Sequence, residues 1–336
     1  MAVSVSLKKL AEILGLAPST VSRALKGHPD ISLATQKKVK ALAREMHYKP
    51  DALALSLRSK RSGSIAVVIP SLKDYFYACA VSSVIQYAFS REYKVMVFEN
   101  EEDQQQEVKI CYFLRKSGID GLIVVPSKTT CDFQPFENLQ NEGIPMVFLD
   151  RIGLNLDTDR VLTDDYYGAY EGVRHMISGG CRKIAHIAIP QQFVWAQKRR
   201  LGYEQALKDY GASHGETRIA VYDHLSDVEE ITRQWLREGL IDGIFAADDT
   251  SAIQAMKIIH EMNCRIPEDI AVCGFGNGPL ALRAFPSLTT VNKDGGRAGV
   301  RAAQLLIHRL EAPAELPTET CLLKAEPVIR ESTRPV

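Results

Sequence analysis

Two pairs of neighbouring carboxylates, Asp164-Asp165 and Asp248-Asp249, are the residues of this 336-residue chain whose type and spacing could perform acid–base catalysis. Catalysis of that kind needs carboxyl groups that converge on one substrate. Neighbours on an extended strand point to opposite faces, so neither pair is expected to converge. The sequence also lacks a nucleophile motif, a P-loop and zinc-ligand spacing. We therefore expect a protein that is not an enzyme and that holds no cofactor and no metal.

The distribution of charge indicates a different chemistry, contact with a polyanion. Residues 1–61 hold twelve Lys and Arg against four Asp and Glu, whereas the formal net charge of the whole chain is zero. Such asymmetry is typical of a protein whose N-terminal piece alone contacts nucleic acid.

Apolar spacing predicts three short helices in this basic piece. Leucines and alanines of residues 7–14 recur at helical spacing, and Gly15 ends that helix. A second helix begins at Pro18 and stops at Gly27, and a third begins after Ser32. Two short helices joined by about four residues form a helix-turn-helix.

The second helix carries the side chains that could read DNA. In this motif the N-terminal end of the second helix enters the major groove, and Ser19, Ser22 and Arg23 face outward there. Arg23 is the first choice for base readout because its guanidinium pairs bidentately with guanine. The short hydroxyls of Ser6, Thr20 and Ser22 suit phosphates.

From residue 64 onward the chain alternates apolar strands with helical stretches, which implies parallel sheets covered on both faces. The strands fall into two sets of four. Segments 160–165 and 288–292 follow the two sets and are expected to cross between two lobes. The predicted strands are 65–70, 94–100, 121–126, 145–150, 183–190, 218–223, 243–249 and 270–276.

Two blocks, "LAEILGLAPSTVSRAL" and "YKPDALALSL" at 48–57, resemble the DNA-binding headpiece of the lactose/galactose repressor (LacI/GalR) family of bacterial transcription regulators. The remainder resembles the two-lobed periplasmic sugar-binding fold that is the sensor of that family, through "DDYYGAY", "RIPEDIAVCGF" and "PSLTTVN". The resemblance implies a small all-α helix-turn-helix headpiece followed by an α/β periplasmic-binding-protein-like domain, with parallel sheets in two Rossmann-like lobes.

The expected domain boundaries follow from these patterns. Residues 1–49 form the DNA-binding domain, 50–63 a hinge helix and linker, and 64–336 the ligand-binding and dimerisation domain. Lobe one is expected at about 64–160 and 293–318, and lobe two at about 161–290 and 319–336.

On the resemblance, Pro18 and Ser19 take the two base-reading positions that open the recognition helix, and Arg23 takes the third. Two residues depart from the family pattern. Ala17 stands where the family usually has a capping Ser, a loss of about 0.5–2 kcal/mol if nothing replaces it. Asp51 stands where Asn is common, and it either brings negative charge near DNA or caps the helix that follows.

The stretch "PDALALSLRSKRSGS" at 50–64 could be a helix or a tether. Leu53 and Leu57 share one helical face, but about nine residues are too few to hold a helix alone in water. In the resembled family the partner's hinge helix and the DNA minor groove cover such leucines. Leu57 would then wedge between base steps, Arg58 would follow the groove and the small Ala54 would allow close approach.

Ligands of open parallel sheets bind beyond the carboxyl ends of the strands, so the loops there are the candidate effector site. By resemblance Tyr75 and Phe76 would wall the pocket, although ordinary helix-start packing is the alternative. Ser127 follows the third strand. Asp150 follows the fourth, where it could accept two sugar hydroxyls or form a surface pair with Arg151.

The second lobe supplies the other candidates. Arg199 stands three residues before Gly202 and matches the family's effector-binding arginine, and Arg199 and Asp248 are the preferred sensor residues. Phe193 and Trp195 flank the preceding loop, and His224 occupies a position that is often aromatic in the family. For these three, simple packing stays an equal alternative.

The segment "GFGNG" at 274–278 departs from the family pattern. Members often carry Asp after Gly-Phe, where it holds ligand hydroxyls, but Gly276 has no side chain. Either Asn277 supplies the polar group or the ligand differs. Pro279 stands where a dinucleotide fingerprint would need its third Gly.

Arg200 is expected to face solvent.

These features predict a sequence-specific, DNA-binding repressor of transcription, a homodimer on a pseudo-palindromic operator, whose affinity a small effector controls. By resemblance the effector is a sugar or sugar derivative, and a nucleobase or nucleoside corepressor is the alternative that the aromatic residues favour. A solute-binding protein without DNA function is a second alternative. It would need an export signal and no basic headpiece, and this chain has the reverse.

The expected location is the cytoplasm, without membrane contact. The start lacks a charged region followed by a long apolar one, and no apolar run approaches the ~20 residues that span a membrane. The seven cysteines form no C-x-x-C pair, which indicates reduced thiols.

Overall fold

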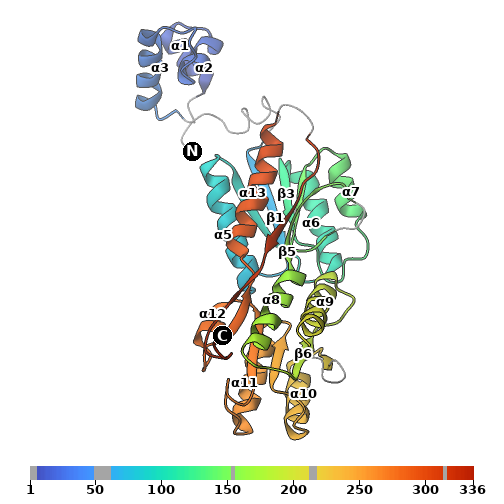
Figure 1. Cartoon of the computed structure of the whole chain (residues 1–336). Helices are drawn as coiled ribbons and strands as arrows, with labels where there is room; N and C mark the ends of the chain where they lie inside the picture. Colours follow the sequence, from blue (N-terminus) through green and yellow to red (C-terminus); the bar gives the residue numbers. More distant parts are fainter. Residues whose placement is uncertain (1–5, 49–61, 153–155, 212–217, 313–315) are drawn as a thin grey trace. The chain divides into compact units, whose positions relative to one another are not determined.

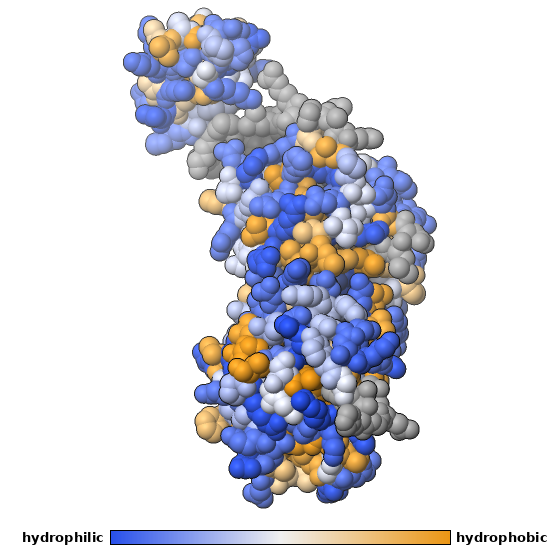
Figure 2. All heavy atoms as spheres, viewed as in Figure 1, coloured by the Kyte–Doolittle hydropathy of each residue, from blue (hydrophilic) through white to orange (hydrophobic). Residues whose placement is uncertain are grey.

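The computed structural model describes residues 6–48, 62–152, 156–211, 218–312 and 316–336. The chain divides into two compact units, Met1–Gly63 and Ser64–Val336 (Figure 1). Within the described residues, no helix combines the length and the apolar character needed to cross a membrane. Figure 2 shows mainly hydrophilic side chains on the visible face, with smaller hydrophobic patches between them.

The described part of the first unit, residues 6–48 and 62–63, contains three helices around a small core. The helices are α1 (Leu7–Leu14), α2 (Pro18–Leu25) and α3 (Leu33–Glu45). Gly15 adopts the left-handed conformation that ends α1, and Ser32 caps α3, as their sequence positions predict. Leu10, Val21 and Val39 are fully buried between the helices. The helix-turn-helix is therefore formed where the sequence predicts it.

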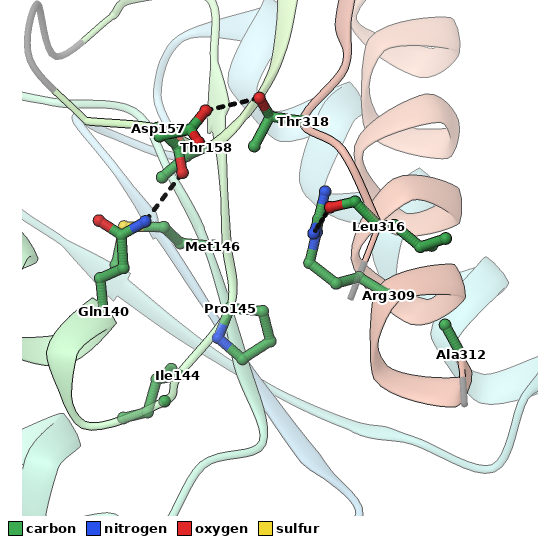
Figure 3. A pocket seen from close by; sticks show the side chains of 11 residues that line it. Gln140, Ile144, Pro145, Met146, Asp157, Thr158, Arg309, Ala312, Leu316 and Thr318 are labelled. Atoms are coloured by element: carbon green, nitrogen blue, oxygen red, sulfur yellow. Dashed lines mark hydrogen bonds between the residues drawn. The ribbon is translucent and has the colours of Figure 1, made fainter. Parts of the chain in front are cut away.

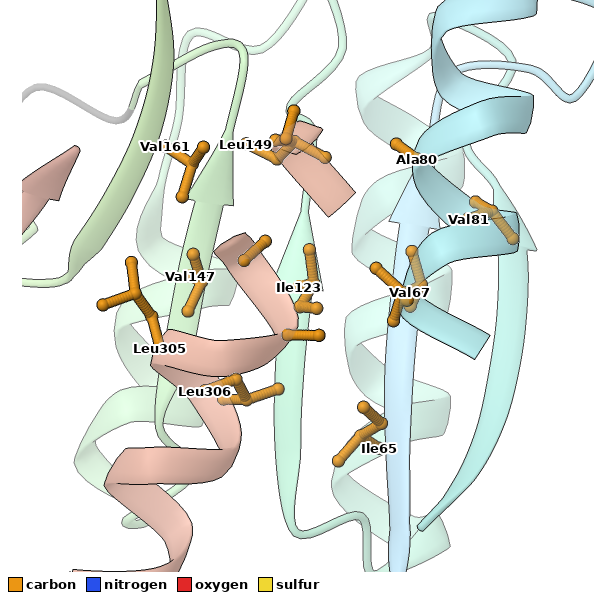
Figure 4. Close-up of a cluster of buried hydrophobic side chains, with 14 of the residues drawn as sticks. Ile65, Val67, Ala80, Val81, Ile123, Val147, Leu149, Val161, Leu305 and Leu306 are labelled. Carbon is orange, nitrogen blue, oxygen red and sulfur yellow. The ribbon is translucent and has the colours of Figure 1, made fainter. Parts of the chain in front are cut away.

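The second unit begins with a six-stranded sheet in the order β11-β5-β4-β3-β1-β2, whose pairings are parallel. Alternate residues of β1 point to opposite faces, as in any strand. Ile65 and Val67 pack under α5 and α13 (Figure 4), and Ala66 and Val68 pack under α6 and α7. The elements are β1 (Ser64–Ile69), α5 (Tyr75–Ser90), β2 (Lys94–Glu99), α6 (Gln104–Ser117), β3 (Gly121–Val124), α7 (Gln134–Asn141), β4 (Met146–Leu149), β5 (Asp159–Asp164), α13 (Gly295–Glu311) and β11 (Thr320–Lys324).

The same unit contains a second sheet in the order β12-β10-β9-β8-β6-β7, in which only the β10–β12 pairing is antiparallel among the described strands. Helices α8 and α9 pack on one face of this sheet, and α10 and α11 pack on the other. The elements are α8 (Asp165–Ser178), β6 (Ile184–Ala188), α9 (Val194–Asp209), β7 (Arg218–Val221), α10 (Leu225–Arg237), β8 (Gly243–Ala246), α11 (Asp249–Glu261), β9 (Ala271–Gly276), α12 (Pro279–Arg283), β10 (Thr289–Asn292) and β12 (Glu326–Val328).

Three crossings connect the two sheets, and they correct the expected lobe boundaries. The chain leaves the first sheet after β5, returns to it after β10, and leaves it again between β11 and β12. Strand β5 extends the first sheet beside β4, so residues 161–164 belong to lobe one and not to lobe two. Residues 320–324 also lie in the first sheet, because β11 pairs with β5 along its whole length.

Candidate functional site

The candidate DNA interface is the outer surface of α2. Pro18, Ser19 and Arg23 are exposed, whereas Thr20 and Ser22 are half-buried. Arg23 lies five residues after the start of the helix, and its guanidinium forms no ion pair with the residues that the structure describes. This arrangement presents a guanidinium and a hydroxyl on one exposed helix, as a recognition helix requires.

Capping of the first two helices differs. The Oγ of Ser6 accepts the backbone N–H of Lys9 at 3.2 Å, so Ser6 caps α1, and this bond does not use its hydroxyl hydrogen. Ala17 supplies no side-chain cap to α2, as its residue type predicts. The predicted hinge residues Ala54, Leu57 and Arg58 lie outside the described residues, as does Asp51.

The candidate effector site is a cavity of about 370 Å³ where the loops after strands of both sheets meet. Parallel sheets place their ligands at this edge. Of the nine predicted effector residues, Ser127, Asp150 and Phe193 line the cavity. The described residues that line the cavity are Pro126, Ser127, Lys128, Thr130, Phe133, Asp150, Arg151, Ile152, Leu162, Thr163, Asp165, Gln192, Phe193, Val194, Trp195, Lys198 and Leu322.

Asp150 is held in the cavity wall by two donors. Its carboxylate accepts the Tyr77 hydroxyl at 2.9 Å and forms an ion pair with the Lys293 ammonium at 2.6 Å. Burial alone would raise the pKa of Asp150, but the positive charges of Lys293 and Arg151 hold that pKa below its ordinary value. Asp150 is therefore an ionised acceptor with lone pairs left for ligand hydroxyls. The alternative of an Asp150–Arg151 surface pair is wrong.

Arg151 is buried and bonds to other groups. Its two terminal nitrogens donate to the two carboxylate oxygens of Glu102 at 2.7 and 2.8 Å, and one of them also donates to the Pro126 carbonyl. Its guanidinium lies over the ring of Trp195, which stacks on Phe193 with ring centroids 4.6 Å apart. The loop after β4 thus contacts α9, so Arg151 joins the two halves of the cavity wall.

Ser127 is a buried part of the loop after β3. Its N–H donates to Glu107 at 2.6 Å, and its hydroxyl shares a hydrogen bond with the Thr129 hydroxyl at 2.8 Å. Burial raises the pKa of Glu107 in spite of the hydrogen bonds that this carboxyl accepts from Thr130 and Ser127. This network fixes the loop that forms one wall of the cavity.

Arg199 lies directly behind the cavity, bonded to a residue that lines it. Its Nε donates to Asp165 at 2.8 Å, one terminal nitrogen donates to the Ala247 carbonyl at 2.6 Å, and the guanidinium lies over the Phe275 ring. Burial raises the pKa of Asp165 against the opposing charge of Arg199. Gly202 allows this pairing because a Cβ there would lie 2.3 Å from the Tyr166 carbonyl, so α9 can approach α8 closely.

Both Asp pairs lie at junctions between a strand and a helix, not along an extended strand. Asp164 caps α8 while Asp165 binds Arg199, and Asp248 caps α11 while Asp249 accepts bonds from elsewhere. The expected divergence of each pair is present, but the helix starts cause it. Among the described residues there is also no cluster of His, Cys, Asp and Glu that could hold a metal ion.

The other predicted effector residues do not line this cavity. Phe76 belongs to the core under α5, and Tyr75 is 52% exposed. His224 is exposed at the start of α10. Asp248 accepts the Ser251 N–H and the Tyr222 hydroxyl, and the Asn277 amide bonds to Asn292 and Arg330. Their side chains are thus satisfied by the protein or directed elsewhere. Arg200 is exposed, as predicted, and it pairs with Glu204.

Gly276 makes room for another carboxylate. A Cβ at Gly276 would lie 3.2 Å from Asp249, and one at Gly274 would lie 2.6 Å from it. Asp249 accepts the Gly278 N–H at 2.9 Å and the Thr290 hydroxyl. The side chain missing at position 276 is therefore replaced in space by a carboxylate from α11.

A second cavity of about 530 Å³ lies near the amino ends of β4 and β5 (Figure 3). Its polar groups bond to one another. The Gln140 amide donates to the Asp157 carbonyl at 2.8 Å, the Thr318 hydroxyl donates to the Asp157 carboxylate at 2.6 Å, and Arg309 donates to Leu316 and Asp159. Because it lies away from the carboxyl ends of the strands, we assign the ligand to the first cavity.

Comparisons with known proteins agree with this architecture. Residues 6–51 match the model of bacterial regulatory proteins of the lacI family, and residues 173–333 match that of a periplasmic binding protein-like domain. The ribose operon repressor of Halalkalibacterium halodurans is 30% identical, over 98% of this chain and 97% of that protein.

Solved structures show the same relationship. The lac repressor dimer bound to operator is 25% identical, with a TM-score of 0.81, and the match covers 99% of this chain and 100% of the other. A CelR–cellobiose complex is 27% identical, with a TM-score of 0.71, and covers 98% of this chain and 99% of that one. The chain therefore belongs to the lacI family of bacterial regulatory proteins.

Proposed function

We propose that this protein represses transcription by binding operator DNA through its N-terminal helices, and that a sugar-like effector in the 370 Å³ cavity changes its operator affinity. The observation that carries the proposal is that one chain combines a basic helix-turn-helix with a cavity lined by loops of two mainly parallel sheets. The proposal involves no catalysis. A DNA target also requires that the protein act in the cytoplasm.

The chemistry of the cavity favours a sugar as effector. Carbohydrates present apolar C–H faces and hydroxyl groups, which match aromatic rings and ionised acceptors. Phe193 supplies a ring and Asp150 an ionised carboxylate. The names of two relatives point the same way, a ribose operon repressor and a CelR–cellobiose complex. The nucleobase alternative is less favoured because Trp195 already stacks on Phe193 and Arg151.

A homodimer would present two recognition helices to a pseudo-palindromic operator. We propose the exposed apolar side chains on α5 and in the α12 region as the dimer surface, because large exposed apolar patches mark protein–protein interfaces. On α5 they are Tyr75, Ile85 and Phe89, and in the α12 region they are Leu280, Leu282 and Phe285. The proposal thus places Tyr75 in the dimer interface instead of the wall of the effector site.

The test is a DNA-binding titration of the full-length protein across a salt series, with a duplex that the protein itself selects from a randomised pool. Several phosphate contacts should give a steep negative slope of log K against log salt. Arg23→Ala should weaken binding by about 1–3 kcal/mol and relax base preference at one position. A flat salt slope, or no binding to any duplex, would overturn the proposal.

The hinge role needs its own variant. Leu57→Ala should weaken operator binding while leaving effector binding unchanged, because the leucine would wedge into the minor groove. The matched control is Leu53→Ala, which makes the same substitution one helical turn earlier. Equal operator affinity of wild type and Leu57→Ala would make residues 50–63 a tether.

A further inference from the structure

The charged residues that line the effector cavity differ in how completely they are paired with residues of opposite charge. Three are cations, Lys128, Arg151 and Lys198, and two are carboxylates, Asp150 and Asp165. A ligand entering this cavity meets both signs of charge. Which of them are available to it depends on the partners that each already has.

Both carboxylates already have a cation of their own. Asp150 is paired with Lys293 at 2.6 Å, and Asp165 is paired with Arg199 at 2.8 Å. The electrostatic attraction that either could offer to a cationic or neutral ligand is therefore reduced. Each keeps lone pairs for hydroxyl groups.

The cations are less completely neutralised. Glu102 binds Arg151 through both carboxylate oxygens, and Lys128 reaches the same carboxylate only at 3.8 Å. The ammonium of Lys198 has no ion pair or hydrogen bond with any residue that the structure describes. The Nε of Arg151 also has no hydrogen-bond partner within the described part of the chain.

A further carboxylate behind the cavity, that of Glu107, does not neutralise these lysines. Glu107 is 2% exposed and accepts bonds from Asn100, Thr130 and the Ser127 N–H. These bonds direct its oxygens to the loop behind the wall. Lys128 therefore shares the Glu102 carboxylate with Arg151 at 3.8 Å, and Lys198 has no carboxylate partner among the described residues.

The two lysines come from opposite halves of the cavity wall. Lys128 follows β3 of the first sheet, and Lys198 lies on α9 beside the second. The two ammonium groups that line this cavity repel each other. A neutral ligand bound between them would not offset this repulsion. An anionic ligand group between them would turn repulsion into two attractions.

We propose that the effector is an anionic sugar derivative, whose phosphate or carboxylate group binds Lys128 and Lys198 while its hydroxyls bind Asp150. Lysine binds phosphate and carboxylate groups strongly as a compact positive charge. This inference rests on the proposed function, because it names the chemical class of the effector for the same cavity.

The test is isothermal titration calorimetry on the full-length protein with matched ligands. Glucose is compared with glucose 6-phosphate and gluconate, and ribose is compared with ribose 5-phosphate. The phosphate and carboxylate arms distinguish the two sources of negative charge. We expect one anionic ligand to bind at least about tenfold more tightly than its neutral counterpart, and its affinity to fall as salt is raised.

The variants assign that gain to the cavity. Lys198→Gln should weaken binding of the anionic ligand by about tenfold and leave the neutral sugar unchanged. Lys208→Gln is the matched control, since Lys208 is exposed on the same helix and does not line the cavity. Both lysines are exposed, so both variants should fold, which circular dichroism checks.

Four results would overturn the inference. The first three are tighter binding of the neutral sugars, failure of every anionic ligand to bind, and an unchanged anion affinity in Lys198→Gln. The fourth is inorganic phosphate that binds as tightly as the sugar phosphates, which would exclude a sugar derivative. None of these affects the regulator itself, because binding to duplex DNA by the same samples tests that proposal separately.

Discussion

The guanidinium carbon of Arg151 lies 4.9 Å from the centroid of the Trp195 ring. Arg151 belongs to the loop after the fourth strand of the first sheet, and Trp195 belongs to α9 of the second half. A cation–π contact in a largely buried place stabilises by about 0.5–2 kcal/mol. This pair is therefore a direct connection between the halves that enclose the effector, and its strength affects how easily they separate.

Removing the arginine should cost more than that contact alone. Arg151→Ala deletes two hydrogen bonds to Glu102 and one to Pro126, so we expect the free energy of unfolding to fall by about 2–4 kcal/mol. Urea denaturation measures the loss. Arg115→Ala, which breaks an exposed pair with Glu142, should leave the free energy of unfolding close to that of wild type. Similar losses in both variants would contradict the connecting role.

A double-mutant cycle isolates the cation–π contact between the Arg151 guanidinium and the Trp195 ring. Arg151→Ala, Trp195→Ala and the double variant should give a coupling free energy of about 0.5–2 kcal/mol. Additive losses would mean that the two residues stabilise their own halves independently.

The buried pair of Arg199 and Asp165 gives a second prediction. Both side chains are less than a tenth exposed, so Arg199→Met leaves a buried carboxylate without its cation. We expect a loss of about 3–5 kcal/mol in urea unfolding, and a smaller loss when Asp165→Asn is added. Arg200→Met, next along the chain and exposed, is the control. If Arg199→Met abolishes effector binding at unchanged stability, Arg199 contacts the ligand directly.

The pH dependence of stability should reveal His186. Burial lowers the pKa of this histidine from 6.5 to about 4, and its ring stacks on Phe245 and contacts the Tyr203 ring at a tilt. The unfolded chain therefore binds a proton in the window between those values that the folded chain does not. Stability is fully present above pH 6.5 and falls as pH drops towards 4, by roughly 3 kcal/mol from this group.

Urea unfolding between these pH values tests the sign. His186→Phe should flatten the decline even if it lowers stability at neutral pH, whereas His308→Gln, an exposed histidine, should leave the slope as in wild type. An equal slope in wild type and His186→Phe would contradict the assignment.

Gly276 should not tolerate the aspartate that the family often carries there. Its φ of 143° lies in a region that favours glycine, and an added carboxylate would meet Asp249 at close range. We expect Gly276→Asp to lower the thermal midpoint more than Gly276→Ala, which adds strain without charge. Adding Asp249→Asn should recover part of the difference. Equal midpoints for the Asp and Ala variants would show that the carboxylates do not meet.

Local patterns were enough to predict most of the fold. The helix starts and stops at Pro18, Gly15 and Ser32 depend on caps and apolar spacing within one or two turns. The eight central strands are nearly continuous apolar runs, because both faces of each sheet are covered. The position of β11 could not be predicted, because its pairing with β5 joins residues about 160 positions apart.

The effector site was predicted less well, for a related reason. Arg151 binds Glu102 from a loop after a different strand, and Asp165 binds Arg199 across two helices. No local spacing in the sequence predicts pairs between residues so far apart in the chain. Phe76 was predicted to line the site because it follows the carboxyl end of a strand, but its side chain packs in the core. The sequence position does not show which way a helix turns the side chains of its first residues.

The most direct measurement for the central claim is the affinity of the full-length protein for its selected duplex, with and without the effector that calorimetry identifies. Coupling between two sites typically changes affinity by about 5–150-fold, and by reciprocity the duplex must change the effector affinity by the same factor. We predict such a change, in either direction, together with matching reciprocal titrations. Operator affinity that is the same with saturating effector as without it would contradict the account.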